Sequence, residues 1–335
     1  MAHAGPRLGP MIDALISNDP LGEALHFLRM SGTMYSRCEF TSPWALVLPE
    51  MPGSLMFHVV TSGRCWIEVG DSQPRQLQPG DLALVPQGEG HRLGSEPGLP
   101  GVRLGDIPPR FVSDRYEILR HGGGGAVATL VCGTVRFNHP AASHLVRILP
   151  RAIVVDAANA GQADWTQSTL RFMAAEAQEL RPGGETVVTR LADILVIQAI
   201  RTWIDQEPAA RTGWLGALRD PRIGVALTLI HRDPSRAWSV SILADAVAMS
   251  RSAFAARFNK LVGEPPMRYL ARWRMHVVHS SLQEDGVPLS ELAHRLGYHS
   301  DAAFNRAFKR YAGITPGALR RSPGPSSNPG LGDSR

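Results

Sequence analysis

A repeat near the C-terminal end constrains the fold of this chain more than any other feature. Between residues 239 and 320, a pattern of Leu-Ala, Ser, two Phe, Gly and Pro occurs twice, and the last five matching pairs are each offset by 50 residues. The copies consist of Leu243-Ala244, Ser250, Phe254, Phe258, Gly263 and Pro266, and of Leu292-Ala293, Ser300, Phe304, Phe308, Gly313 and Pro316. A group of residues that recurs with the same spacing indicates two copies of one supersecondary unit.

Each copy predicts two short helices joined by a tight turn. In the first copy, apolar residues follow helical spacing from 240 to 247, and Ser250 can cap a second helix that carries Phe254 and Phe258 on one face. The second copy predicts a helix over 289 to 296, a turn at 297 to 299, and Ser300 as the next cap. The small Ala after each Leu lets the first helix cross the second closely, so each copy predicts a helix-turn-helix.

The face of each second helix that lies opposite the two Phe residues could enter a DNA major groove. In the second copy this face carries Asn305 and Arg306, which suit bidentate contacts with adenine and guanine edges. The first copy is poorer in such donors, and we expect it to depend more on shape and apolar contact. The predicted base contacts are Ser252, Ala255, Arg257, Asp301, Ala302, Asn305 and Arg306, and the predicted phosphate contacts are Arg251, Lys260, Arg272, Arg274 and Lys309.

Residues 266 to 282 predict a third kind of element, a helix that connects the two units. Its predicted apolar stripe consists of Met267, Leu270, Met275, Val277 and Val278. A rigid connector would let the two second helices read major-groove segments about one turn of DNA apart, roughly 34 Å.

The distribution of charge favours nucleic acid as a partner over the alternative that the repeat is a packing module. Residues 220 to 321 hold 15 Lys and Arg against 8 Asp and Glu, a net charge of +7, whereas residues 1 to 219 hold 19 against 21, a net charge of −2. A local positive excess supplies the salt-dependent part of DNA affinity that does not depend on sequence.

The C-terminal stretch resembles the DNA-binding domain of the AraC/XylS family of bacterial transcription regulators. The matching motifs begin at Trp238, Met249, Pro266 and Leu296, and they read WSVSILAD, MSRSAF, PMRYLARWRM and LGYHSDAAFNRAFKR. The resemblance implies a seven-helix domain with two motifs that binds asymmetric sites in double-stranded promoter DNA, and it implies RNA polymerase as a partner. Ala256 departs from the family, which usually has a polar or basic residue there, and this puts base reading by the first unit in doubt.

Upstream, residues 35 to 149 carry short apolar runs separated by Pro- and Gly-bearing turns, which predict a sandwich or barrel. Gly80-Asp81, Pro86 and His91 resemble the second motif of the cupin barrel, and Phe57-His58 stands where the first motif would fall. The resemblance implies a cupin-like sensor for an unknown small effector. The fold class expected for the whole chain is therefore α+β multidomain, with a β-barrel followed by an all-α domain with two helix-turn-helix motifs.

The histidines of the two cupin-like motifs leave the question of a metal ion open. Cupin enzymes hold a metal through a His-x-His pair, a Glu and the second-motif His, but here Val59 and Val60 follow His58. We therefore expect no catalytic site and no enzyme; the alternative function is a cupin-type metalloenzyme with a regulatory DNA-binding domain. A weaker hypothesis is that His58 and His91 meet and bind a metal ion with Cys132 or Cys65, as imidazole and thiolate permit. The alternative is two interior histidines satisfied by hydrogen bonds.

Three cysteines, an odd count in a long chain, do not suggest a disulfide framework. They are either small apolar core residues or an oxidant sensor in which Cys38 or Cys65 pairs with Cys132.

Helical spacing returns between residues 163 and 205, where a break at 181 to 184 separates two predicted helices. The second, over 186 to 204, has more apolar residues than one packing face requires, so we expect a homodimer interface there; the alternative is a helix buried within one chain. Residues 11 to 30 predict an amphipathic helix, residues 206 to 217 a linker, and Pro221 suits the first turn of a helix over 222 to 231.

The expected domains are a cupin-like sensor (1–150), a helical dimerisation segment (151–217), a DNA-binding domain (218–321) and a disordered tail (322–335). No run approaches the roughly 18 apolar residues of a membrane helix. The first 30 residues lack the pattern of a secretory signal. We therefore expect a cytoplasmic protein without a membrane partner.

Overall fold

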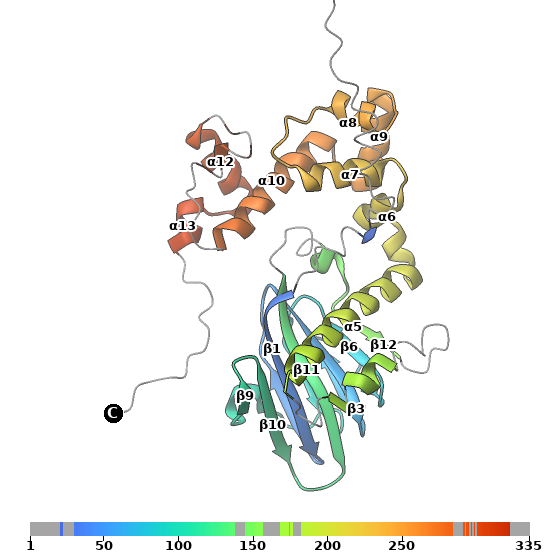
Figure 1. Cartoon of the computed structure of the whole chain (residues 1–335), viewed down its shortest axis with the longest axis vertical. Helices are drawn as coiled ribbons and strands as arrows, with labels where there is room; N and C mark the ends of the chain where they lie inside the picture. Colours follow the sequence, from blue (N-terminus) through green and yellow to red (C-terminus); the bar gives the residue numbers. More distant parts are fainter. Residues whose placement is uncertain are drawn as a thin grey trace, which may run out of the picture. The chain divides into compact units, whose positions relative to one another are not determined.

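The computed structural model of this chain describes residues 21–22, 30–137, 145–156, 168–173, 175–176, 182–283, 291, 293–294, 296, 298 and 300–321. The chain divides after Ala210 into a sheet-bearing unit and a helical unit that begins at Arg211 (Figure 1). The predicted helix over 11 to 30 and the predicted tail fall almost wholly outside the described residues.

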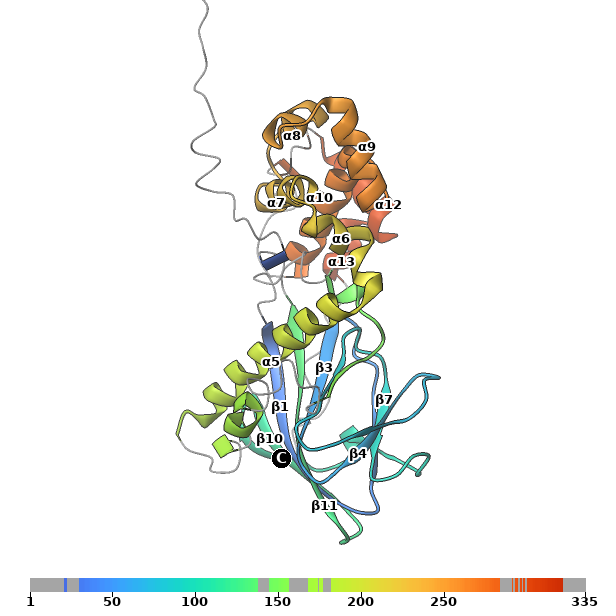
Figure 2. The same cartoon turned by 90° about the vertical axis from the view of Figure 1, so that its right-hand side faces the viewer.

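The sheet-bearing unit consists of two sheets that face one another (Figure 2). The seven-stranded sheet has the order β12-β6-β3-β11-β1-β10-β9, and the five-stranded sheet has the order β5-β4-β7-β2-β8. The strands are β1 (Met30–Thr41), β2 (Ala45–Leu48), β3 (Ser54–Ser62), β4 (Cys65–Val69), β5 (Arg75–Leu77), β6 (Leu82–Val85), β7 (His91–Gly94), β8 (Val102–Arg103), β9 (Arg110–Ser113), β10 (Tyr116–Gly122), β11 (Val127–Phe137) and β12 (Ile153–Val155). The expected barrel is thus a two-sheet sandwich with open edges.

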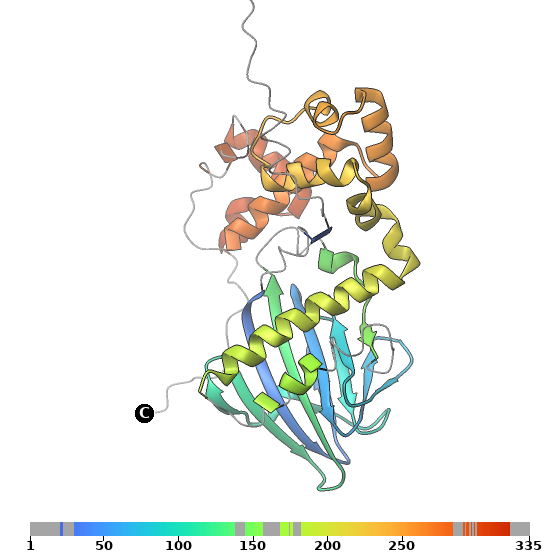
Figure 3. The ribbon, with the colours of Figure 1, turned by 45° about the vertical axis from the view of Figure 1, so that its right-hand side comes forward.

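Side-chain alternation explains why these segments form strands. In β4, Cys65, Ile67 and Val69 are buried while the residues between them are half-buried, as expected when one face meets the core. In β3 both faces are buried: Met56, His58 and Val60 face the interior between the sheets, whereas Phe57 and Val59 lie on the other face. The helix α5 (Gly184–Gln206) crosses that outer face and contacts β6 and β12 (Figure 3).

The turn predicted at Gly80-Asp81 is confirmed. Gly80 has a φ of +93° and donates its N–H to the Val60 carbonyl at 2.8 Å. The Asp81 carboxylate accepts the N–H of Gln78 at 2.8 Å, which closes the turn before β6. The strand ends before Pro86 and β7 begins at His91, so this local geometry brings His91 back into the sandwich.

The helical unit contains α6 (Gly213–Arg219), α7 (Ile223–Arg232), α8 (Val240–Ala246), α9 (Arg251–Val262), α10 (Pro266–Gln283), α12 (Asp301–Ala312) and α13 (Pro316–Arg321). The expected linker over 206 to 217 is wrong in its second half, because α6 occupies 213 to 219 and follows a short 3-10 helix, Pro208–Arg211. Trp214, Leu215 and Leu218 are buried, and α6 packs against α7 and α9. The glycine and alanine residues of this segment are typical of a linker and led to the wrong prediction. The spacing of its apolar residues is nevertheless that of a helix.

The repeat predicted from the sequence is confirmed at the ends of its helices. Ser250 and Ser300 accept the N–H groups of Ala253 and Ala303, each at 3.3 Å. Gly263 and Gly313 end α9 and α12 at φ values of 86° and 76°, a backbone region that favours glycine. Pro266 and Pro316 then begin the next helices. The predicted helix over 289 to 296 lies mostly outside the described residues.

The apolar stripe predicted for α10 is partly wrong. Met267 is 38% exposed, whereas Tyr269 and Trp273, which the predicted stripe left out, are buried. These two large rings are four residues apart and occupy the face that packs inside the unit. No helix in the described ranges is long and apolar enough to span a membrane.

Candidate DNA-reading helices and sensor cavity

The second helix of the second unit, α12, presents a polar face opposite its buried phenylalanines. Phe304 and Phe308 are 2% and 0% exposed. The structure places all the residues predicted on this helix at the surface, namely Asp301, Ala302, Asn305, Arg306 and Lys309. Arg310, which the sequence reasoning did not assign, is also exposed, and it follows Arg306 by four residues on the same face.

The corresponding helix of the first unit, α9, presents fewer hydrogen-bond donors. Ala255 is half-buried, which weakens its assignment as a base contact, while Ala256 is exposed. Asn259 was missed by the sequence reasoning, although it lies three residues after Ala256 and is exposed. Asparagine can pair with adenine through two hydrogen bonds, so helical spacing would have identified this residue. The remaining predicted residues of α9 are also exposed, namely Arg251, Ser252, Arg257 and Lys260.

Arg257 lies at the flank of α9, where its guanidinium contacts Asp220. Asp220 Oδ2 accepts Arg257 Nε at 3.0 Å and Nη2 at 2.5 Å, and its other oxygen accepts the N–H groups of Arg222 and Ile223 at 3.0 and 2.9 Å. Burial acts to raise the pKa of Asp220, but the hydrogen bonds from Arg257 and from these backbone groups outweigh it, so the pKa lies below its ordinary value.

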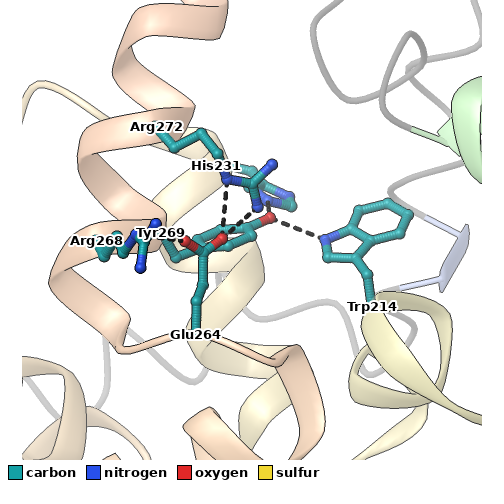
Figure 4. Close-up of polar contacts among 6 residues, drawn as sticks. All are labelled: Trp214, His231, Glu264, Arg268, Tyr269 and Arg272. Carbon is teal, nitrogen blue, oxygen red and sulfur yellow. Dashed lines mark hydrogen bonds and ion pairs between the residues drawn. The ribbon is translucent and has the colours of Figure 1, made fainter. Parts of the chain in front are cut away.

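Two of the arginines predicted to contact phosphate, Arg272 and Arg274, have partners within the helical unit. Arg272 donates Nε at 2.8 Å and Nη2 at 2.5 Å to Glu264 Oε1 (Figure 4). Arg274 donates to the backbone carbonyls of Pro234 and Arg236 at 2.7 and 2.9 Å. These contacts fix both side chains against their own domain, so we favour the more exposed Arg251, Lys260 and Lys309 as phosphate contacts.

A buried polar cluster of Trp214, His231 and Tyr269 joins α6, α7 and α10 (Figure 4). Trp214 Nε1 donates to Tyr269 Oη at 2.8 Å, and this hydroxyl lies 2.7 Å from His231 Nε2. The His231 ring stacks on the Trp273 ring with their centroids 3.9 Å apart. The Phe258 ring of α9 packs edge-on against the Tyr269 ring, with the centroids 5.7 Å apart. Burial raises the pKa of Tyr269, so its hydroxyl stays protonated. This cluster holds α6 against the helix-turn-helix unit that contains α9. We call α9 and α12, the two helices predicted to contact bases, the first and second reading helices.

A cavity of about 210 Å³ opens within the sheet-bearing unit. Apolar side chains line it from both sheets, together with the sulfur atoms of Cys38, Cys132, Met51 and Met56. A polar side includes Ser36 and Glu117, whose side chains are joined by a 2.5 Å hydrogen bond. The cavity can therefore enclose a small, largely apolar molecule and offer it a few polar contacts.

His58 and His91 meet in the interior of this unit, as the metal hypothesis required. Their Nε2 atoms are 2.7 Å apart, while His91 Nδ1 lies 2.9 Å from the Glu89 carbonyl and His58 Nδ1 lies 3.1 Å from Cys132 Sγ. Burial lowers the pKa of both rings, so both are neutral. A carbonyl only accepts, so His91 Nδ1 donates to it, His58 Nε2 donates to His91, and the Cys132 thiol donates to His58.

This hydrogen-bonded chain does not support a metal site. His91 and Cys132 contact opposite nitrogens of the His58 ring, so one ion cannot bind all three. Across the described residues, no group of three or more His, Cys, Asp or Glu side chains could hold a metal ion. The geometry instead matches two interior histidines that satisfy one another.

All three cysteines are buried, and none forms a disulfide in the described structure. Burial raises the pKa of Cys65 to about 12. Unlike Cys38 and Cys132, Cys65 does not line the cavity, which disfavours it as a sensor of a molecule bound there. A hydrogen bond with Cys38, and burial, raise the pKa of Cys132. Cys38 and Cys132 are thus neighbours at the cavity wall, on the adjacent strands β1 and β11.

Comparisons with known proteins agree with this architecture. The sequence model of the family described as Cupin matches residues 19–205, and that of the family described as Helix-turn-helix domain matches residues 243–322. A putative AraC-like transcription regulator from Streptomyces lividans is 35% identical over 91% of this chain and 99% of its own length. One from Streptomyces antibioticus is 34% identical over 92% and 100%.

Among solved structures, the DNA-binding domain of AdpA in complex with a target DNA is 28% identical over 29% of this chain and 87% of that chain, with a TM-score of 0.28. The two matched families and the full-length relatives assign the function of the chain as well as its folds. The chain belongs to the AraC-like transcription regulators, DNA-binding proteins that here combine a cupin-like N-terminal domain with a C-terminal helix-turn-helix domain.

Proposed function

We propose that this regulator reads promoter DNA mainly through α12, with Asn305 and Arg306 as base contacts beside Asp301 and Ala302. The exposed face of α12 opposite its buried phenylalanines carries this proposal. Asparagine and arginine side chains can each make two hydrogen bonds to one base edge. Ser252, Arg257 and the newly identified Asn259 are the corresponding donors on α9, while Arg251, Lys260 and Lys309 contact phosphate.

Selection of bound sequences from a random duplex pool, at about 150 mM salt, tests this reading. The full-length chain should enrich one asymmetric site, and the Arg306→Ala variant should lose its preference at one position of that site. Enrichment of no sequence by the unchanged protein, with and without added reductant, would contradict DNA reading by the free protein. An unchanged motif in the variant would contradict the role of Arg306 alone.

The cavity between the sheets is the proposed effector site, and its volume carries this part of the proposal. About 210 Å³ is smaller than the roughly 300–1,000 Å³ of pockets for drug-sized ligands, which favours a small effector with one polar group. Replacing Leu119 with Trp should fill the cavity, because this side chain lines it from β10. The variant should still bind promoter DNA but no longer respond to the effector in a reporter assay.

The neighbouring thiols of Cys38 and Cys132 support a second candidate, a response to peroxide, which the raised pKa of Cys132 would make slow. Two thiols and one peroxide molecule would give one disulfide and two molecules of water, or an alcohol and water from an alkyl peroxide. The Cys38→Ser and Cys132→Ser variants should then lose the peroxide response of a reporter promoter, whereas the Cys65→Ser control should keep it. An unchanged response in all three variants would exclude the disulfide.

A homodimer through α5 and a contact with RNA polymerase complete the proposal. Val187 and Ile194 are 45% and 40% exposed on α5, and Leu191 between them is half-buried. Residues at these spacings share one side of a helix, so they form a short apolar stripe suited to a second copy. The relatives are transcription regulators, which favours a regulatory protein over the alternative of a metalloenzyme.

A further inference from the structure

The first reading helix lacks arginine at the position where the second has its best donor. The repeat offset of 50 residues matches Ala256 of α9 with Arg306 of α12, and Ala255 with Asn305. Base reading by α9 therefore depends on donors around this position. Arg257 is the next residue, but its side chain leaves the helix at the flank and would not by itself be aimed at a base.

Asp220 holds this flanking side chain in one orientation. The carboxylate accepts both Nε and Nη2 of Arg257, and its second oxygen accepts two backbone N–H groups at the start of α7. The Asp220 side chain is only 8% exposed, whereas the Arg257 side chain is 49% exposed. A nearly buried carboxylate, held by backbone N–H groups, thus binds the Nε and Nη2 edge of the guanidinium, while about half of the Arg257 side chain stays exposed to solvent.

The contact leaves donors on Arg257 but balances its charge. Within the described part of the chain, the hydrogen bonds of Arg257 use Nε and Nη2, so the two N–H groups of Nη1 can still meet an outside acceptor. A phosphate oxygen is negatively charged and would be repelled by the adjacent carboxylate. A guanine edge carries neutral acceptors and gains from a donor that is already ordered.

We propose that Asp220 is a specificity-determining positioning residue that directs Arg257 to a base edge and keeps it from serving as a phosphate contact. Nothing in the local sequence marks this role, because the two residues are 37 positions apart. The proposal rests on the proposed reading of DNA by α9 and adds to it the residue that sets how Arg257 is used.

The test compares Asp220→Asn with Asp245→Asn in the full-length protein. The amide introduced by Asp220→Asn would keep an oxygen that can accept the backbone N–H groups of α7, but the negative charge would be lost. Asp245 is exposed on α8 and forms no ion pair with another described residue, so its variant removes the same charge from the domain without touching Arg257. The dissociation constant is measured against salt concentration for the selected duplex and for duplexes altered at each position.

We expect Asp220→Asn to lose about tenfold preference at one base pair relative to Asp245→Asn. We also expect the slope of the logarithm of the binding constant against the logarithm of salt concentration to become more negative by about 0.9, because the freed guanidinium reaches a phosphate. Arg257→Ala should lose the same preference with little change in slope. Arg257→Lys should also lose it, since an ammonium lacks the planar fork. If Asp220→Asn fails to fold, as judged by circular dichroism, the two Arg257 variants still test the base contact on which the role of Asp220 depends.

Two results would overturn the proposal. Equal slopes and equal preferences in Asp220→Asn and Asp245→Asn would mean that Asp220 only caps α7. A uniform loss across all duplexes in Arg257→Ala, with a slope reduced by about 0.9, would make Arg257 a phosphate contact. Arg306→Ala serves as the reference: if it relaxes one position while Arg257→Ala relaxes none, this proposal fails and DNA reading by α12 stands.

Discussion

At the scale of single residues, the buried pair of His58 and His91 makes the sheet-bearing unit sensitive to pH. Burial lowers the pKa of both rings in the folded chain, whereas the unfolded rings titrate near 6.5. Below about pH 6.5 the unfolded chain therefore binds more protons than the folded chain, and stability falls as the pH falls. Above that value the full contribution of the pair is present.

We predict that local stability at β3 and β11 decreases by up to about 1.4 kcal/mol per pH unit for each histidine below pH 6.5. Hydrogen exchange of peptides from these strands, corrected for the intrinsic exchange rate, measures it. His58→Gln and His91→Gln should each flatten the dependence, whatever they do to absolute stability. The control is His121→Gln, because this ring is only half-buried. Equal pH dependence in all variants would contradict the argument.

Lys309 and Arg306 lie on the same face of α12, but replacing each with Ala should change DNA binding in a different way. A phosphate contact carries no sequence information, so Lys309→Ala should weaken binding to every duplex alike and reduce the salt slope by about 0.9. Arg306→Ala should instead cost about 1–3 kcal/mol at one base pair. Fluorescence anisotropy on selected and scrambled duplexes separates the two effects. Loss of preference in Lys309→Ala would reassign this residue to a base.

At the scale of elements, the two reading helices depend on equivalent serine caps. Ser250 and Ser300 each satisfy a backbone N–H in the first turn, so replacing either with Ala should destabilise its helix by roughly 0.5–2 kcal/mol. Ser241→Ala is the control, because this serine is exposed on α8, away from both caps, and should change stability by less than about 0.5 kcal/mol. Hydrogen exchange of α9 and α12 reports the loss. Equal protection in cap and control variants would mean that packing alone holds these helices.

The elements that the sequence predicted best are those fixed by local signals. Serine caps, paired phenylalanines and terminal glycines act within a few residues, so α9 and α12 follow directly from spacing. The sequence also supported a meeting of His58 and His91 through their cupin-like motifs, and the structure confirms it at 2.7 Å. Asp220 and Arg257 could not be paired in this way, because only the packing of α6 and α7 on α9 brings them together.

At the scale of the whole molecule, the proposed effector cavity and the reading helices belong to different units of one chain. The cavity lies within the sheets, while α9 and α12 lie in the unit that begins at Arg211. The chain passes between the units through α5, the short 3-10 helix and α6, and α6 is fixed to α7 and α10 by the Trp214, Tyr269 and His231 contacts. Changes in α6 would therefore reach the support of the first reading helix directly.

The apolar stripe on α5 gives the last prediction, which concerns assembly. Ile194 is 40% exposed, and a carboxylate there would have to lose its water in any interface that covers the stripe. At micromolar concentration, light scattering should give about twice the 36.4 kDa mass of one chain, and Ile194→Glu should shift the mass toward that of one chain. Gln206→Glu, an exposed change at the end of the same helix, should leave the dimer intact. A single-chain mass for the unchanged protein would mean that α5 serves one chain alone, and that each molecule meets its promoter with only α9 and α12.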